Sequence, residues 1–418
     1  MKTALVLCGG GSLGAYEIGA WKYLQEVGMH FDIVTGTSIG AINGAMVATD
    51  DYEKAEALWN NVAADQVMVN GVNFYSGFLH DFDKQKGNRL WSFAKTFIKN
   101  GGADITPLVN LVHKSIDPKK IKETKTRIGV VTTTYPGLKE VDVILNDVKE
   151  SLILDYLHAS SACYPIFPMY TINHQKYIDG GYHNNLPIDL AIKMGADKIV
   201  AVLLHAVPKV PQHPEYMKLP FVTTIRPSHD TGSIMDFDGK VAKRNMLLGY
   251  LDAKKTFGDC WGRSYCFKKD ESLSDIMESF ALAIANNDLE DFYKTTGALA
   301  YEGKTPKSSR EIFIRTLESL AEEIDMDYCA EYEVIPFMKS LIEKIRGLGK
   351  KKEAMDFRSH HNYSFGISKK EKNGFLLYLD YLATNHMKMN KIDALVKRNP
   401  EVAAYKEMYL VFDKLGLL

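Results

Sequence analysis

The sequence has few cysteines, no excess of charge of either sign and no long apolar run. Its 418 residues include five cysteines, an odd number, and the closest pair, Cys260 and Cys266, fits no metal signature. These cysteines predict reduced thiols rather than a disulfide framework. No stretch reaches the roughly 18 apolar residues of a membrane span. The first apolar run, residues 3–8, is too short for a secretory signal. We therefore expect a cytoplasmic protein.

The composition is that of an ordinary globular chain. Hydrophobic residues make up 46% and charged residues 25%, which excludes disordered and collagen-like classes. Lys+Arg number 51 and Asp+Glu 52, a net charge of -1. This balance argues against a nucleic-acid-binding protein.

Strand and helix patterns alternate at the start of the chain. Residues 3–8 and 31–36 are short apolar runs typical of buried parallel strands. A helix pattern follows each of them, from Ala15 to Gly28 and from Ser38 to Ala48. This alternation predicts an α/β fold with a mainly parallel sheet.

Further elements and a change of pattern outline the rest of the chain. We expect strands at residues 127–135, 141–146, 176–179 and 198–207 and a helix at 151–163, with a turn at Pro136-Gly137. Residues 51–125 are mostly helical by pattern and predict a cap-like insertion, with a loop at Asn70–Gly77. The domains expected are a catalytic domain, 1–260, and an accessory helical region, 261–418.

A G-x-S-x-G motif stands between the second strand and its helix. Gly36, Ser38 and Gly40 match the turn that exposes a serine Oγ near a helix N-terminus, with glycines where side chains would clash. The alternative is a turn in which Ser38 only caps the helix. The strand-turn-helix context favours the nucleophile.

The glycines at Gly9, Gly10, Gly11 and Gly14 allow two functional interpretations. They fit the dinucleotide fingerprint, but that fold places an acid at the end of the second strand, and Asp32 lies at its start. Alternatively, backbone N–H groups of the loop form an oxyanion hole. Adjacent parallel strands would bring this loop beside the serine turn, which favours the oxyanion hole over the dinucleotide site and over a plain turn.

A serine nucleophile needs a base, and three residues are candidates. His205 follows a strand and His183 follows a turn, but neither lies in an obvious catalytic loop. Asp179 ends a strand and is followed by Gly180 and Gly181, which keep side chains away from it. Such a triplet is also common in ordinary turns.

The sequence resembles the patatin-like phospholipase family in four segments, VLCGGGSLGAYEIGA, FDIVTGTSIGAINGAMVA, SSACYPIFP and YIDGGYHNNLPIDLAIKMGADKIVAV. They cover roughly residues 3–207, and residues 225–255 resemble the end of bacterial members. The resemblance implies a three-layer α/β/α sandwich related to the cytosolic phospholipase A catalytic domain.

The resemblance also implies a Ser–Asp dyad without histidine. Ser38 matches the nucleophile and Asp179 the base, and the loop at Gly9, Gly10 and Gly11 matches the oxyanion hole. Many bacterial members have Lys or Arg at the position of Leu13, so any role of that charge is absent here. No cofactor is implied, and no metal motif is present. With an ordinary Asp pKa of about 3.9 the base would be weak.

We expect a hydrolase of lipid acyl esters. The alternatives are a carboxylesterase or thioesterase for soluble acyl esters, and a nucleotide-binding regulatory protein.

Between Lys339 and Arg398, 14 Lys+Arg and 6 Asp+Glu give a net charge of +8, and Lys350, Lys351 and Lys352 lie among aromatic residues. Such a segment is either a solvated surface or a peripheral contact with anionic membranes.

Overall fold

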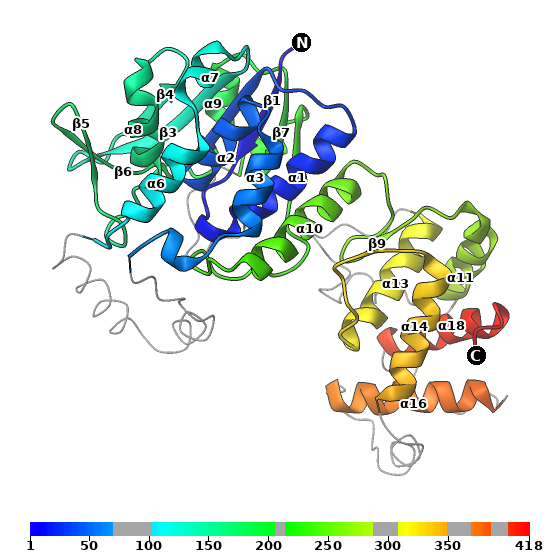
Figure 1. The fold of residues 1–418 in the computed structure, drawn as a ribbon. Coiled ribbons are helices and arrows are strands. Elements are labelled where there is room, and N and C mark those ends of the chain that lie inside the picture. Colours follow the sequence, from blue (N-terminus) through cyan, green and yellow to red (C-terminus); the bar gives the residue numbers. More distant parts are fainter. Residues whose placement is uncertain (70–101, 205–213, 287–307, 349–368, 386–399) are drawn as a thin grey trace. The chain divides into compact units, whose positions relative to one another are not determined.

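The computed structural model describes residues 1–69, 102–204, 214–286, 308–348, 369–385 and 400–418 (Figure 1). The chain separates into two compact units, Met1–Phe257 and Gly258–Leu418. The predicted loop Asn70–Gly77, His205 and the lysines Lys350–Lys352 lie outside the described residues. None of the described helices is both long and apolar enough to cross a membrane.

The first unit is built on an eight-stranded sheet. Its strands are β1 (Thr3–Leu7), β2 (Ile33–Thr37), β3 (Arg127–Tyr135), β4 (Glu140–Ile144), β5 (Tyr170–Ile172), β6 (Gln175–Asp179), β7 (Lys198–Val202) and β8 (Val222–Ile225). Five of them run parallel in the order β3-β2-β1-β7-β8. β4 and β6 pair antiparallel with β3, and β5 pairs antiparallel with β6. The predicted mainly parallel sheet is confirmed.

Helices cover both faces of this sheet (Figure 1). They are α1 (Ala15–Glu26), α2 (Ile39–Ala48), α3 (Tyr52–Asn60), α6 (Thr106–Ser115), α7 (Pro118–Glu123), α8 (Ile153–Ser160), α9 (Ile188–Lys193) and α10 (Gly239–Thr256). Successive side chains of a strand point to opposite faces. In β2, Val34 lies against Gly44 of α2, whereas Thr35 Oγ1 donates to the carbonyl of Pro187, just before α9. The three-layer α/β/α sandwich is therefore confirmed.

α1 and α10 cross with almost no space between their backbones. A Cβ on Gly19 would lie 1.7 Å from the Met246 carbonyl oxygen, and one on Gly249 would lie 1.9 Å from that of Tyr16. Real Cβ atoms do not approach backbone so closely, so both positions require glycine for this packing.

The elements differ from the sequence predictions in several places. The strand expected over 198–207 ends at Val202, and β8 was not predicted. The helix expected over 151–163 ends at Ser160, because the next turn bends to the sheet, where the Ala162 carbonyl accepts the N–H of Asp179. β5 was not predicted, since three residues are too few for a strand pattern to emerge. The hairpin of β3 and β4 around Pro136-Gly137 is confirmed.

The second unit is mainly helical, as predicted for the C-terminal region. Its described helices are α11 (Ser274–Asn286), α13 (Ser309–Glu323), α14 (Val334–Gly347), α16 (Lys369–Thr384) and α18 (Pro400–Lys414). A short parallel pair, β9 (Cys266–Phe267) and β10 (Glu331–Tyr332), accompanies them. These elements enclose their own core, with Phe267, Phe313 and Phe412 fully buried.

Candidate active site

Ser38 occupies the tight turn between β2 and α2. Its backbone has φ 56° and ψ −124°, a conformation that is strained for a residue with a side chain. The flanking glycines are required, because a Cβ on Gly36 would lie 2.2 Å from the Gly40 carbonyl oxygen. The Ser38 side chain makes no capping hydrogen bond to α2. The alternative in which Ser38 only caps the helix is therefore wrong.

The N–H of Ser38 is held by a second serine that the sequence analysis did not single out. It donates to Ser160 Oγ at 3.0 Å, and that hydroxyl donates to the Val131 carbonyl at 2.7 Å. Ser160 thus ties the serine turn to the neighbouring strand β3.

Asp179 ends β6, on the other side of β3 from β2. Its side chain is only 6% exposed. The carboxylate accepts the N–H of Gly181 at 2.7 Å, and the Ser38 side chain is close enough to lower its pKa. A Cβ on Gly180 would lie 2.2 Å from the Val131 carbonyl oxygen, which explains the first glycine after the aspartate. The structure thus brings Ser38 and Asp179 together.

Burial changes the acidity of Asp179. It raises the pKa of this carboxyl from 3.8 to about 6, while the hydrogen bonds from Ser38 and from the N–H of Gly181 act in the opposite direction. The expectation of an ordinary aspartate pKa is therefore wrong. A carboxylate with this higher pKa is a stronger base and is still ionised at neutral pH.

The glycine loop lies beside the serine. A Cβ on Gly9 would lie 3.2 Å from Ser38 Cβ. The N–H of Gly9 already donates to the Asn185 carbonyl at 3.0 Å. The N–H groups of Gly10 and Gly11, in contrast, donate to no acceptor among the described residues. Of the three predicted oxyanion-hole donors, two are therefore available.

The segment after β8 supports the same loop. Gly11 has φ 56°, and a Cβ there would lie 2.2 Å from the Ile234 carbonyl oxygen. That carbonyl accepts the N–H of Ser12 at 2.9 Å, and Ser12 Oγ donates to the Ser233 carbonyl at 2.7 Å. On the other side, a Cβ on Gly14 would lie 2.6 Å from a side-chain carbon of Ile39. Gly11 and Gly14 thus allow the loop to pack between this segment and α2.

A buried acidic side chain that the sequence analysis missed lies behind the loop. Glu17 is 1% exposed and accepts the N–H of Cys8 at 2.7 Å and Asn43 Nδ2 at 2.8 Å. Burial raises its pKa to about 8. Because Asn43 belongs to α2, Glu17 links the start of the glycine loop to the helix that follows Ser38.

His183 and Asp32, two other candidates from the sequence, do not join this site. Nε2 of His183 contacts the Leu138 carbonyl oxygen. The Asp32 carboxylate accepts the N–H of Thr3 at the start of β1, whereas the glycine loop follows the end of that strand. It therefore cannot hold a ribose at the loop, as a dinucleotide site would need.

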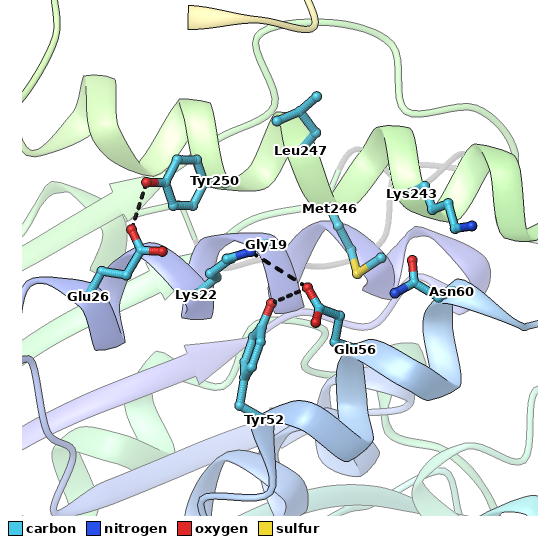
Figure 2. A pocket seen from close by; sticks show the side chains of 10 residues that line it. All are labelled: Gly19, Lys22, Glu26, Tyr52, Glu56, Asn60, Lys243, Met246, Leu247 and Tyr250. Atoms are coloured by element: carbon cyan, nitrogen blue, oxygen red, sulfur yellow. Dashed lines mark hydrogen bonds and ion pairs between the residues drawn. The ribbon is translucent and has the colours of Figure 1, made fainter.

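A surface pocket of about 370 Å³ lies between α1, α3 and α10, and none of the predicted site residues lines it (Figure 2). Its carboxylates have partners within the pocket. Glu56 accepts from Tyr52 and pairs with Lys22 at 3.7 Å, and Glu26 accepts the Tyr250 hydroxyl at 2.6 Å (Figure 2). In the part of the chain that the structure describes, no group of three or more His, Cys, Asp or Glu side chains could hold a metal.

The fold and this site define an α/β/α protein with a serine–aspartate pair at one edge of a mainly parallel sheet, next to a glycine loop. Comparison with known proteins agrees with this description. Residues 5–192 match the sequence model of the patatin-like phospholipase family, a range that includes Gly9–Gly14, Ser38 and Asp179. The resemblance seen in the sequence is therefore confirmed.

Two curated relatives each match about half of the chain. Triacylglycerol lipase 4 of Saccharomyces cerevisiae is 26% identical over 232 residues, which are 50% of this chain and 25% of the lipase. Human patatin-like phospholipase domain-containing protein 6 is 28% identical over 211 residues, 48% of this chain and 13% of that protein. The chain thus spans a quarter or less of these relatives. Among solved structures, VipD from Legionella pneumophila aligns with a TM-score of 0.40 and 14% identity, covering 100% of this chain and 90% of that one.

Proposed function

We propose that this protein is a serine hydrolase that cleaves carboxylic esters of phospholipids or related lipids. The observation that carries the proposal is the interaction of the Ser38 side chain with the buried Asp179 carboxylate, whose pKa it lowers, beside a glycine loop that approaches Ser38 and has two available N–H groups. The family match of residues 5–192 and the lipase and phospholipase names of the relatives support lipid esters as the substrate class.

In the first half of the reaction, Ser38 Oγ attacks the ester carbonyl carbon. The proton of the hydroxyl passes to Asp179 as the C–O bond forms, and the carbonyl electron pair moves onto the carbonyl oxygen. The N–H groups of Gly10 and Gly11 stabilise this oxyanion. When the intermediate collapses, the ester C–O bond breaks, and Asp179 returns the proton to the leaving alcohol. Ser38 is left acylated.

In the second half, water takes the place of the alcohol. Asp179 accepts a proton from the water as its oxygen attacks the acyl carbon, and the same N–H groups hold the second oxyanion. Collapse releases the fatty acid and returns the proton to Ser38 Oγ. The N-terminus of α2 directly after Ser38 adds a favourable dipole for the negative charge.

Lipid and soluble esters can be separated by one substrate panel. We expect kcat/KM to rise with acyl chain length, from short soluble esters and thioesters to long-chain esters, and to be high for phospholipid in vesicles. The reason is that each buried CH₂ of an acyl chain contributes about 0.8 kcal/mol. Titration of released acid over the panel measures this. Activity confined to short soluble acyl esters would support the carboxylesterase or thioesterase alternative.

We also propose peripheral contact with anionic membranes and a cytoplasmic location. The support for the membrane contact is the net charge of +8 between Lys339 and Arg398, most of which lies outside the described residues. The support for the location is the five cysteines, all of which are free thiols. The vesicle arm of the panel tests the contact. Faster hydrolysis in anionic than in neutral vesicles, lost as salt rises, is the expected result, because exposed charges more than about 8 Å apart are screened at physiological ionic strength.

A further inference from the structure

Asn185 makes two hydrogen bonds to Gly9 of the glycine loop, one with its N–H and one with its carbonyl. Its backbone carbonyl accepts the N–H of Gly9 at 3.0 Å, and its side-chain Nδ2 donates to the Gly9 carbonyl at 2.9 Å. Nδ2 also lies 3.1 Å from Cys8 Sγ. The side chain is 3% exposed, so water does not compete for these bonds. Asn185 follows Asp179 by six residues, and the sequence analysis gave it no role.

The Gly9 carbonyl belongs to the same peptide unit as the N–H of Gly10. A peptide unit is planar and almost always trans, so its C=O and N–H point in opposite directions. A peptide between two glycines rotates as a unit with little steric resistance, because neither residue has a Cβ. The hydrogen bond from Asn185 Nδ2 fixes the C=O end of this unit and thereby the direction of the Gly10 N–H.

On this basis we propose that Asn185 is the positioning residue of the oxyanion hole, orienting the Gly10 N–H through the Gly9 carbonyl. The inference rests on the proposed function. The bond also polarises the peptide, because hydrogen bonds at the two ends of one unit strengthen each other. Asn185 therefore acts on the strength of the donor as well as on its direction.

The Asn185 side chain also lies between the glycine loop and the turn that holds Asp179. A Cβ on Gly9 would lie 2.3 Å from Asn185 Oδ1, and a Cβ on Gly181 would lie 2.7 Å from that oxygen. Gly181 is the residue whose N–H donates to Asp179. Asn185 is thus packed between the oxyanion loop and the turn that holds the carboxylate, and both neighbours must be glycine to admit it.

The chain offers a matched control in the preceding residue. Asn184 is also buried, at 1% exposure, but its Nδ2 donates to Glu140 at 3.0 Å and to Asp189 at 2.7 Å, not to the glycine loop. Its backbone carbonyl accepts Thr37 Oγ1, a bond that a side-chain substitution leaves in place. Asn184→Ala therefore removes the same amide from the same turn without touching the loop.

The test compares Asn185→Ala and Asn185→Asp with Asn184→Ala and wild type. Asn185→Asp keeps the side-chain shape, so it covers the case in which the alanine variant fails to fold. We expect both Asn185 variants to lower kcat by about 10- to 100-fold, with KM nearly unchanged. This loss is no larger than that from removing one oxyanion donor, because the Gly10 N–H is misdirected rather than removed. Asn184→Ala should stay close to wild type.

A long-chain alkyl trifluoromethyl ketone supplies a readout that a general loss of structure would not move. Ser38 adds to the ketone carbon, and the former ketone oxygen becomes an oxyanion in the same hole. Its affinity should fall in parallel with kcat in the Asn185 variants and not in Asn184→Ala. Unchanged kcat in both Asn185 variants, or reduced kcat with unchanged inhibitor affinity, would overturn the inference. If instead wild type hydrolyses no acyl ester, or Ser38→Ala remains active, the proposed function itself fails.

Discussion

Replacing Ser38 by alanine is expected to lower kcat/KM for ester hydrolysis by at least about 10⁴-fold, as for loss of the nucleophile in other serine hydrolases. The oxyanion donors of the glycine loop remain, but no group is left to form the acyl-enzyme. The free energy of unfolding should change by no more than about 1 kcal/mol, since one hydrogen bond to Asp179 is lost and the Cβ is retained.

Ser161→Ala is the matched control for this substitution. Ser161 is a nearby buried serine that follows α8 directly, and its hydroxyl donates to the Leu157 carbonyl of that helix at 3.0 Å. Its replacement should leave hydrolysis close to wild type. Initial rates with a long-chain ester, together with thermal unfolding, measure both effects. Substantial residual activity in Ser38→Ala would show that another residue is the nucleophile.

Asp179→Asn is expected to lower kcat by about 10³- to 10⁴-fold, the upper part of the range for general base catalysis. Asparagine has the shape of aspartate but cannot accept the proton of Ser38. The fold should not be weakened, because the substitution removes a carboxylate that is buried at a cost. Wild-type turnover in this variant, or loss of activity on replacing His183 or His205 instead, would favour a histidine triad.

The raised pKa of Asp179 gives the pH dependence of both activity and stability. The base is the ionised form, so kcat/KM should rise with pH, reach half of its maximum at about pH 6 and level off above that. The contribution of Asp179 to the free energy of unfolding changes with pH in the opposite direction. The folded protein holds the Asp179 proton up to about pH 6 and the unfolded chain only to about 3.8, so this contribution is present at low pH and lost as pH rises between these values.

The asparagine variant lacks both dependences. Its unfolding free energy relative to wild type should therefore be higher at pH 8 than at pH 4. Denaturant unfolding at the two pH values checks the difference, and pH–rate profiles of the free enzyme check the midpoint. A midpoint of kcat/KM near the ordinary aspartate pKa would show that burial does not raise the pKa of Asp179, and would contradict this account.

Local sequence indicates Ser38 as the proposed nucleophile, whereas Asp179 is one of three candidate bases until the family resemblance singles it out. Ser38 sits in a strand-turn-helix pattern in which Gly36 and Gly40 clear the backbone, and Asp179 ends a strand before two glycines. The α/β alternation predicts that β1 and β2 are parallel neighbours, and the observed register, Leu7 opposite Gly36, places the glycine loop beside the serine. The family resemblance joined these pieces, and the strands they follow lie where the sequence predicted.

The residues that position this chemistry could not be read from the sequence. Ser160 holds the Ser38 N–H across 122 residues, and Asn185 holds the Gly9 carbonyl across 176. Glu17 is a charged residue among the otherwise uncharged buried residues of α1. The sequence shows that such a residue is unusual, but it does not show which groups it hydrogen-bonds. The pKa of Asp179 depends on burial, which local patterns do not specify. The predicted donor Gly9 illustrates the same limit, since its N–H is taken by a residue far along the chain.

The central claim is that Ser38 is an activated nucleophile, and covalent labelling by a fluorophosphonate tests it most directly. Such a reagent phosphonylates a serine Oγ with loss of fluoride, at a useful rate only where a base and an oxyanion hole are in place. We predict a single adduct on folded protein, mapped by peptide mass spectrometry to Ser38, with no labelling of Ser38→Ala and much slower labelling of Asp179→Asn. An adduct on a different residue, or none on folded wild-type protein, would contradict the account.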